Sequence, residues 1–119
     1  MATFKSFEDL DVWKKSCALA VAVYGITREW RDWGLRDQMQ RSAVSIASNI
    51  AEGYERRGQD FVRFLRIAKG SAAELRTQIY IAKKIGPIPD KEFSELLDES
   101  KQISRMLTGL SKSIENRPS

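Results

Sequence analysis

Apolar residues recur every three or four positions along most of the chain, the spacing of helices that bury one face. Turn signals divide this pattern into four windows, and no useful length of sequence alternates with the period of two that is typical of strands. The windows predict helices over residues 9–28, 35–55, 59–85 and 90–116. Short connections between helices of this length predict an all-α, up-down-up-down antiparallel four-helix bundle. Residues 1–8 then form an N-terminal arm and residues 117–119 a C-terminal tail.

Each predicted boundary has a local cause. The first connection, EWRDWG, contains Trp30 and Trp33, which we expect to fold back over the end of the bundle. Gly58 supplies the turn between the second and third helices. Gly86 ends the third helix, and the prolines that follow prevent it from continuing. Asp90 is expected to cap the fourth helix.

The apolar surface exceeds what one four-helix core needs. In the first helix we expect a main stripe of Leu10, Trp13, Cys17, Ala20, Val21 and Tyr24, and a second, weaker stripe of Val12, Leu19 and Val23. In the second helix, a second stripe consists of Val44, Ala47 and Ala51. Ile67 and Ile81 lie off the core line of the third helix. Large apolar patches on a soluble chain usually mark partner surfaces, so the pattern favours a homo-oligomer.

The stretch RSAVSIASNIAEGYERRG, residues 41–58, is rich in small residues for a helix interior. In an antiparallel hairpin that turns near Gly58, facing residues have numbers that sum to about 115. This register places small residues of the second helix against small residues of the third, with Ser45 opposite Gly70, and Ser42 and Ala43 opposite Ala72 and Ala73. It also predicts two facing pairs of opposite charge: Arg41 with Glu74, and Glu52 with Arg63. The stretch therefore predicts a closely packed seam between the two helices.

Two residues of this stretch allow both a structural and a functional interpretation. Asn49 lies at the edge of the core stripe, where it is suited either to an interhelical hydrogen bond that fixes the register or to contact with a partner. Gly53 costs about 1 kcal/mol relative to Ala inside a helix. Packing against Phe61 or Phe64, or the close approach of a ligand, must offset that cost.

Basic residues gather around the turn between the second and third helices. The chain has 20 Lys and Arg against 16 Asp and Glu, a formal net charge of +4, which is compatible with nucleic-acid contact without requiring it. The cluster consists of Arg56, Arg57, Arg63, Arg66 and Lys69. It is either a phosphate-binding patch or a solvated face neutralised by the interspersed Glu52, Glu55 and Asp60. Phe61 and Phe64 have core spacing, so base stacking is not indicated.

The residues that are missing argue against several kinds of chemistry. The chain has no histidine, the commonest general base and metal ligand, and its single cysteine, Cys17, lies in an apolar context that favours a buried structural thiol. No Gly-rich phosphate loop or metal-ligand set occurs. We therefore expect no metal, no cofactor, no small-molecule substrate and no catalytic residues.

The sequence also predicts where the protein acts. No apolar run approaches the roughly 18 residues that span a bilayer. The N-terminal MATFKSFEDLDVW lacks the features of a secretory signal. These observations predict no membrane partner and a cytoplasmic protein.

Three segments resemble a known family. FEDLDVW, GLRDQMQRSAVSIASNIAEGYER and DFVRFLRIAKGSAAELRTQIYIAKKIG are similar to the small four-helix-bundle proteins associated with 23S rRNA intervening sequences. The resemblance spans nearly the whole chain. One departure is Ala47, where many members have proline, so the helix is expected to run straighter here.

The resemblance implies a ring-like homopentamer but no settled activity. Some members of the family are encoded within inserts in 23S rRNA genes, others stand alone, and distant relatives bind nucleic acid to assist reverse transcriptases. The family signature falls on Ser45, Ile46, Asn49, Ile50, Ala51, Glu52 and Gly53, and then on Ala68, Gly70, Ser71, Glu74 and Leu75. None of these residues forms a catalytic constellation.

Two functions follow from these observations. The first is a non-enzymatic, ribosome-associated oligomeric scaffold that binds structured RNA or a nucleoprotein partner. Its candidate binding residues are Asn49, Glu52, Arg56, Arg57, Arg63, Arg66 and Lys69. Arg41, Ser45, Gly53, Gly70, Ser71 and Glu74 are assigned to the structural seam. The second is a protein–protein adaptor that makes no direct contact with nucleic acid.

Overall fold

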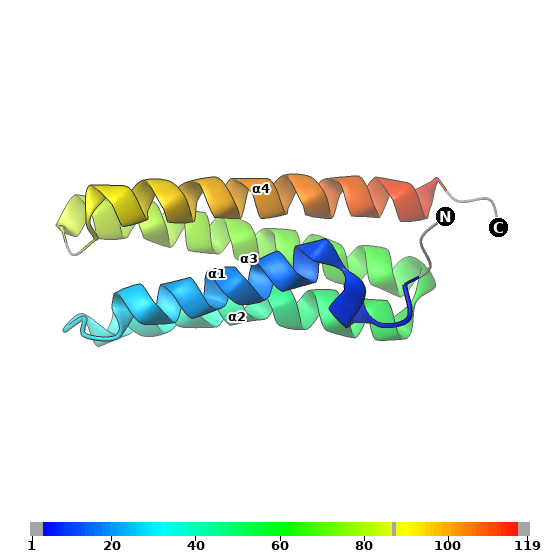
Figure 1. Ribbon diagram of the computed structural model, residues 1–119, viewed down its shortest axis with the longest axis horizontal. Helices are drawn as coiled ribbons and strands as arrows, with labels where there is room; N and C mark the ends of the chain where they lie inside the picture. Colours follow the sequence, from blue (N-terminus) through cyan, green and yellow to red (C-terminus); the bar gives the residue numbers. More distant parts are fainter. Residues whose placement is uncertain (1–3, 87, 117–119) are drawn as a thin grey trace.

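The computed structural model describes residues 4–86 and 88–116, and it is all-α over these residues. A short 3-10 helix, η1, precedes four α-helices that run antiparallel as a rod of 50 × 20 × 20 Å (Figure 1). The elements are η1, Phe7–Asp9; α1, Asp11–Thr27; α2, Trp33–Arg56; α3, Gly58–Ile85; and α4, Asp90–Glu115. The predicted all-α bundle of four helices is confirmed. The predicted tail, 117–119, and the first three residues of the predicted arm lie outside the described residues.

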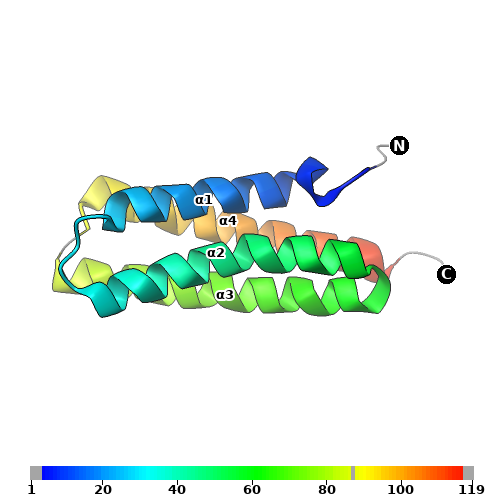
Figure 2. The same cartoon turned by 90° about the horizontal axis from the view of Figure 1, so that it is seen from below.

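The four helices pack as neighbours around a square. Figures 1 and 2 show α2 beside α3, α3 beside α4, and α1 closing the square against α2 and α4. The α2–α3 pair has the most extensive contact and the α1–α4 pair the least. Within the described residues, α1 does not approach α3 and α2 does not approach α4, so these pairs are diagonal. The α2–α3 seam is therefore the closest of the four, as the small residues of both helices predict.

The helix ends follow from side-chain capping and from backbone conformation. Asp32 caps the start of α2, since its Oδ1 accepts a hydrogen bond from the backbone N–H of Leu35 at 3.0 Å. Gly86 ends α3 with φ of 98° and donates its N–H to the carbonyl of Ala82. Asp90 is the first residue of α4 rather than its cap, because Pro89 occupies the capping position. The acidic side chain still lies in the first turn, and it pairs with Lys83 at the end of α3.

Buried aliphatic side chains from all four helices form one core. Its members, each at most 4% exposed, are Leu10, Val12, Leu19, Val23, Met39, Ala43, Ile46, Ile50, Leu65, Ala68, Ala72, Leu75, Ile79, Ala82, Ile88, Leu96, Ile103 and Leu107. Burial on this scale is the main source of stability in a bundle of this size.

The core face of α1 is a correction to the sequence prediction. Val12, Leu19 and Val23, predicted as the weaker stripe, are buried, whereas Val21 is 73% exposed and Tyr24 is 44% exposed. Leu10 of the predicted main stripe is nevertheless buried, and Trp13 and Ala20 pack against the core, so the prediction was wrong at Val21 and Tyr24. The buried stripe includes Ser16, whose hydroxyl donates to the carbonyl of Val12 at 2.7 Å. A serine satisfied by its own helix can face the core, which a count of apolar residues does not register.

The two tryptophans of the first connection behave differently. Trp30 packs against the core as predicted, whereas Trp33 opens α2 and is 68% exposed, so the prediction for Trp33 was wrong. At the other end of the rod, the described part of the arm lies on the bundle. The hydroxyl of Tyr54 donates to the carbonyl of Phe4 at 3.0 Å, and Phe7 makes an edge-to-face contact with Trp13.

Candidate nucleic-acid interface

The predicted basic residues lie around the turn between α2 and α3. This turn is at the end of the rod where α1 begins and α4 ends (Figure 1). Arg56 is the last residue of α2, Arg57 links the helices, and Arg63, Arg66 and Lys69 follow on α3. All five side chains are exposed, so the fold brings the whole predicted cluster to the surface of one end of the bundle.

An aromatic ring orients two of these arginines. The guanidinium carbons of Arg56 and Arg63 lie over the ring of Phe64, at 5.0 Å and 4.7 Å from its centroid. Phe64 itself is only 8% exposed, because its ring is covered and packs into the seam. A guanidinium that rests on a ring keeps the N–H groups at its edge free to donate. Phe64 therefore combines core packing with support for the arginines, and its core spacing gave no sign of the second role.

Acidic neighbours hold the same arginines from the side. Arg56 pairs with Glu52 at 3.1 Å and with Asp60 at 3.5 Å, and Arg63 pairs with Asp60 at 3.6 Å. Arg66 reaches across to Glu115 of α4 at 3.3 Å. These side chains are 42–70% exposed, so each pair contributes at most about 1 kcal/mol to stability. The expected Glu52–Arg63 pair does not form, because Glu52 pairs along its own helix with Arg56.

Arg57 is the residue of the cluster with an unusual backbone. Its φ of 66° and ψ of 173° fall in a region that glycine occupies readily and other residues occupy at a cost of about 1–3 kcal/mol. Among the described residues, neither Arg57 nor Lys69 forms an ion pair. Their two side chains are therefore the basic groups of this cluster that no acidic side chain contacts.

A chain of hydrogen bonds crosses the seam at its middle. The hydroxyls of Ser45 and Ser71 lie 2.9 Å apart, and Nδ2 of Asn49 donates to both the hydroxyl and the carbonyl of Ser45, at 2.9 Å and 2.8 Å. The Ser45 hydroxyl accepts from Asn49 and shares a hydrogen bond with the Ser71 hydroxyl in which either oxygen can donate. The interhelical hydrogen bond that the sequence suggested for Asn49 is therefore made by Ser45. Asn49 bonds within its own helix and positions the Ser45 hydroxyl.

The register differs by one residue from the prediction. Ser71, not Gly70, lies opposite Ser45, and Gly70 is exposed with open space where a Cβ would stand. Gly53 is the glycine that meets a close neighbour. A Cβ built on it would lie 2.7 Å from the Cβ of Phe64, a distance that real contacts do not show.

A shallow groove follows the seam beyond the Ser45–Ser71 bond. It is lined by Gln38, Arg41, Ser42, Ser45, Glu74 and Gln78. Arg41 and Glu74, expected to face each other, both line it without an ion pair between them among the residues described here. Gln38 and Gln78 belong to no motif or cluster that the sequence pattern indicates. The predicted register places position 38 level with position 77, and the observed Ser45–Ser71 pairing brings it level with Gln78 instead.

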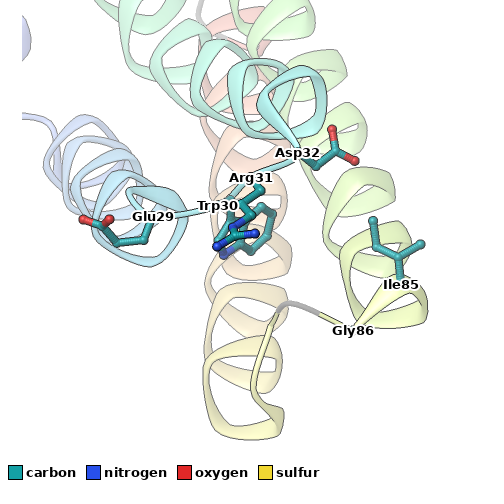
Figure 3. Close-up of a pocket in the computed structure, with 6 residues that line it drawn as sticks. All are labelled: Glu29, Trp30, Arg31, Asp32, Ile85 and Gly86. Atoms are coloured by element: carbon teal, nitrogen blue, oxygen red, sulfur yellow. The ribbon is translucent and has the colours of Figure 1, made fainter.

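The described residues at the opposite end of the rod show no convergent chemistry. A second hollow there is lined by Glu29, Trp30, Arg31, Asp32, Ile85 and Gly86. In Figure 3 the carboxylates of Glu29 and Asp32 point away from each other, on either side of Trp30 and Arg31. Paired carboxylates for acid–base chemistry would have to converge on one point, and these do not.

No group of three or more His, Cys, Asp or Glu side chains among the residues that the structure describes has the arrangement of a metal site. Burial raises the pKa of the Cys17 thiol, so it stays protonated near neutral pH and is a poor nucleophile. None of the helices in residues 4–86 and 88–116 has the length and apolar character needed to cross a bilayer.

Comparison with known proteins supplies the context for this surface. A family model described as 23S rRNA-intervening sequence protein matches residues 8–109. A solved structure from Bacteroides thetaiotaomicron, titled as a protein with unknown function from the S23 ribosomal protein family, is 25% identical. It superposes with a TM-score of 0.79 over 85% of this chain and 98% of its own. A search of curated proteins found no significant match.

Proposed function

Since the chain belongs to the 23S rRNA-intervening sequence protein family, we propose that it is a non-enzymatic, oligomeric scaffold that binds structured RNA, or a nucleoprotein containing it, in the cytoplasm. The α2–α3 turn supplies the contact surface. Arg57 is its centre, with Arg56 and Arg63 beside it on Phe64.

The conformation of Arg57 is the observation that carries this proposal. Glycine at this position would remove the free-energy cost of the backbone conformation. The chain has a long cationic side chain there instead, which lowers the stability of the turn. Arginine donates to phosphate oxygens in a planar fork, and phosphate contacts supply most of the affinity for structured RNA. The neighbouring arginines add donors whose directions are already fixed by the Phe64 ring.

The test is binding to 23S rRNA fragments over a series of salt concentrations. We expect the affinity to fall steeply with salt, and the triple variant Arg56→Ala/Arg57→Ala/Arg63→Ala to reduce the slope of log affinity against log salt by roughly two to three. The matched control Lys84→Ala/Lys91→Ala/Lys101→Ala removes the same charge from exposed sites elsewhere. Equal losses in both variants, or a wild-type affinity that does not respond to salt, would exclude the α2–α3 turn as the RNA surface.

A protein–protein adaptor is the second candidate, and the ion pairs of the cluster favour it. Glu52, Asp60 and Glu115 neutralise three of the five basic residues. An adaptor predicts that a specific protein partner is retained after nuclease treatment, and that the triple arginine variant still binds it.

We also propose that the scaffold is a ring-like homopentamer. Exposed apolar side chains support assembly: Val21 and Tyr24 on α1, Val44 on α2, and Ile67, Ile81 and Ile85 on α3. Removing such side chains from water is favourable, so their exposure on a lone chain needs a partner surface.

A further inference from the structure

Two arginines beside the α2–α3 turn share one carboxylate and one aromatic ring. One oxygen of Asp60 lies 3.5 Å from Nη1 of Arg56, and the other lies 3.6 Å from Nε of Arg63. The Cζ atoms of both arginines lie over the Phe64 ring, at 5.0 Å and 4.7 Å from its centroid. Phe64 is only 8% exposed, so the two guanidinium groups, and not the ring, face the solvent. We refer to this pair, Arg56 and Arg63 on Phe64, as the arginine platform.

The contacts of Arg56 show which part of its guanidinium group is free. Oε2 of Glu52 accepts hydrogen bonds from Nε at 3.2 Å and from Nη2 at 3.1 Å, and Asp60 lies next to Nη1. Guanidinium N–H groups donate in the plane of the group, so these carboxylates occupy its edges. The Phe64 ring covers one of its two faces. The opposite face is left to the solvent, and the Arg56 side chain is accordingly 48% exposed.

The platform and its acidic neighbours together have no net charge, because Glu52 and Asp60 balance Arg56 and Arg63. A phosphate near the platform is attracted by the arginines and repelled by the carboxylates, so it gains less than the arginines alone would provide. A flat, uncharged group is not repelled in this way, and guanidinium planes stack on nucleobases in RNA recognition. An exposed planar surface without net charge is therefore better suited to a base than to a phosphate.

We propose that the arginine platform stacks against an unpaired base of a bound RNA while Arg57 binds the neighbouring phosphate. The inference rests on the proposed function, and it narrows the ligand to RNA with a bulge or a loop. In a continuous A-form helix each base is covered by its neighbours, so an unpaired base is the one that offers a face. Arg57 directly follows Arg56, is exposed, and forms no ion pair within the described residues. It therefore supplies the positive charge that the platform lacks.

The experiment measures the fluorescence anisotropy of three labelled RNA duplexes at one salt concentration. One duplex is fully paired, one carries a single unpaired adenosine, and one carries an abasic nucleotide in place of that adenosine. We expect the full chain to bind the adenosine bulge at least about fivefold more tightly than the other two, since stacking of one base contributes about that factor or more. Equal binding of the abasic bulge would overturn the stacking, because that duplex keeps the bend and the phosphates.

The double variant Arg56→Lys/Arg63→Lys tests the platform at constant charge. Lysine keeps the positive charge but lacks the plane on which a base stacks, so the preference for the adenosine bulge should fall below about twofold. Binding to the fully paired duplex should not change. The control Arg66→Lys/Arg105→Lys makes the same substitutions at exposed side chains outside the platform and should keep the preference. A preference that survives in the platform variant would overturn the assignment.

The outcomes also separate this inference from the proposed function. If all three duplexes bind equally and their affinity falls with salt, the platform does not stack a base and the RNA scaffold stands. If no duplex binds in a salt-dependent way, the proposed function fails and the inference fails with it. A protein that is retained after nuclease treatment, and lost in the platform variant, would assign the platform to a protein side chain instead.

Discussion

At the scale of single residues, two glycines that look alike in the sequence have opposite roles. Both interrupt helix interiors, and each costs about 1 kcal/mol relative to Ala in an isolated helix. Gly53 is buried at the point where α2 approaches Phe61 and Phe64 of α3, whereas Gly70 faces open space. Only at Gly53 does close packing explain the residue.

The same substitution should therefore change stability in opposite directions at the two sites. Gly53→Ala is expected to destabilise the bundle by about 1–3 kcal/mol, because the new methyl group overpacks the seam against the Cβ of Phe64. Gly70→Ala is expected to stabilise it by up to about 1 kcal/mol through helix propensity. Urea unfolding monitored by circular dichroism measures both. A destabilising Gly70→Ala would show that a neighbour occupies the space near Gly70 in solution.

Arg57 allows stability and binding to be separated. Arg57→Gly should stabilise the chain by about 1 kcal/mol, because glycine adopts a φ of 66° without the clash that a Cβ creates. The same variant should bind 23S rRNA fragments more weakly if Arg57 contacts phosphate. Thermal unfolding and a binding titration on one preparation give the two readings. Glycine at the exposed position 84, Lys84→Gly, is the control, and there we expect lower stability with unchanged binding.

At the scale of elements, α1 shows how a helix with two apolar sides is oriented. Val21 and Tyr24 are exposed on its outer side, whereas Ser16 and Thr27 are buried on the side that faces the core. Both hydroxyls bond to carbonyls four residues earlier in the same helix, at 2.7 Å. The partners that α1 meets, rather than its own composition, decide which side is buried.

Two valines that are two residues apart, and so lie on nearly opposite sides of α1, test this orientation. Val23→Ala removes two methyl groups from a fully buried site and should destabilise the bundle by roughly 1–3 kcal/mol. Val21→Ala changes a side chain that is 73% exposed and should alter stability by no more than about 0.5 kcal/mol. The free energies of unfolding of the two variants decide between the faces. The reverse order would restore the orientation that the apolar count alone predicted.

At the scale of the whole molecule, the exposed apolar residues lie on more than one side of the rod. Val21 and Tyr24 lie on α1, and Ile67 and Ile81 on α3, the helix diagonal to it. A two-fold dimer uses one self-complementary patch, whereas a ring joins one patch to a different patch on the next copy. The separated patches therefore favour the head-to-tail contact of a closed ring, as we propose.

Light scattering tests the assembly. The proposed pentamer has a mass five times the 13.6 kDa of one chain. We expect Val21→Glu and Ile81→Glu each to give monomers, because each destroys one half of every head-to-tail contact. Mixing the two variants should produce dimers and no ring, since one good contact survives. The control Ser94→Glu, on the exposed side of α4, should leave the mass unchanged. A monomeric wild-type chain would refute the assembly.

The amino-acid sequence by itself determined the helices, their order and the closest seam. These follow from local causes: the periodicity of apolar residues, Gly86 at a helix end, and the small residues that let α2 approach α3. It also located the basic cluster, because residues close in sequence across a tight turn stay close in space.

The tertiary structure decided what depends on neighbours from other helices. It showed which side of α1 is buried, that Glu115 reaches Arg66 from the far end of the chain, and that Phe64 supports two arginines. It also aligned Gln38, Arg41, Glu74 and Gln78 along one groove. Periodicity reports the faces of a single helix, but a groove between two helices depends on their register, and one residue of error in register changes which side chains meet.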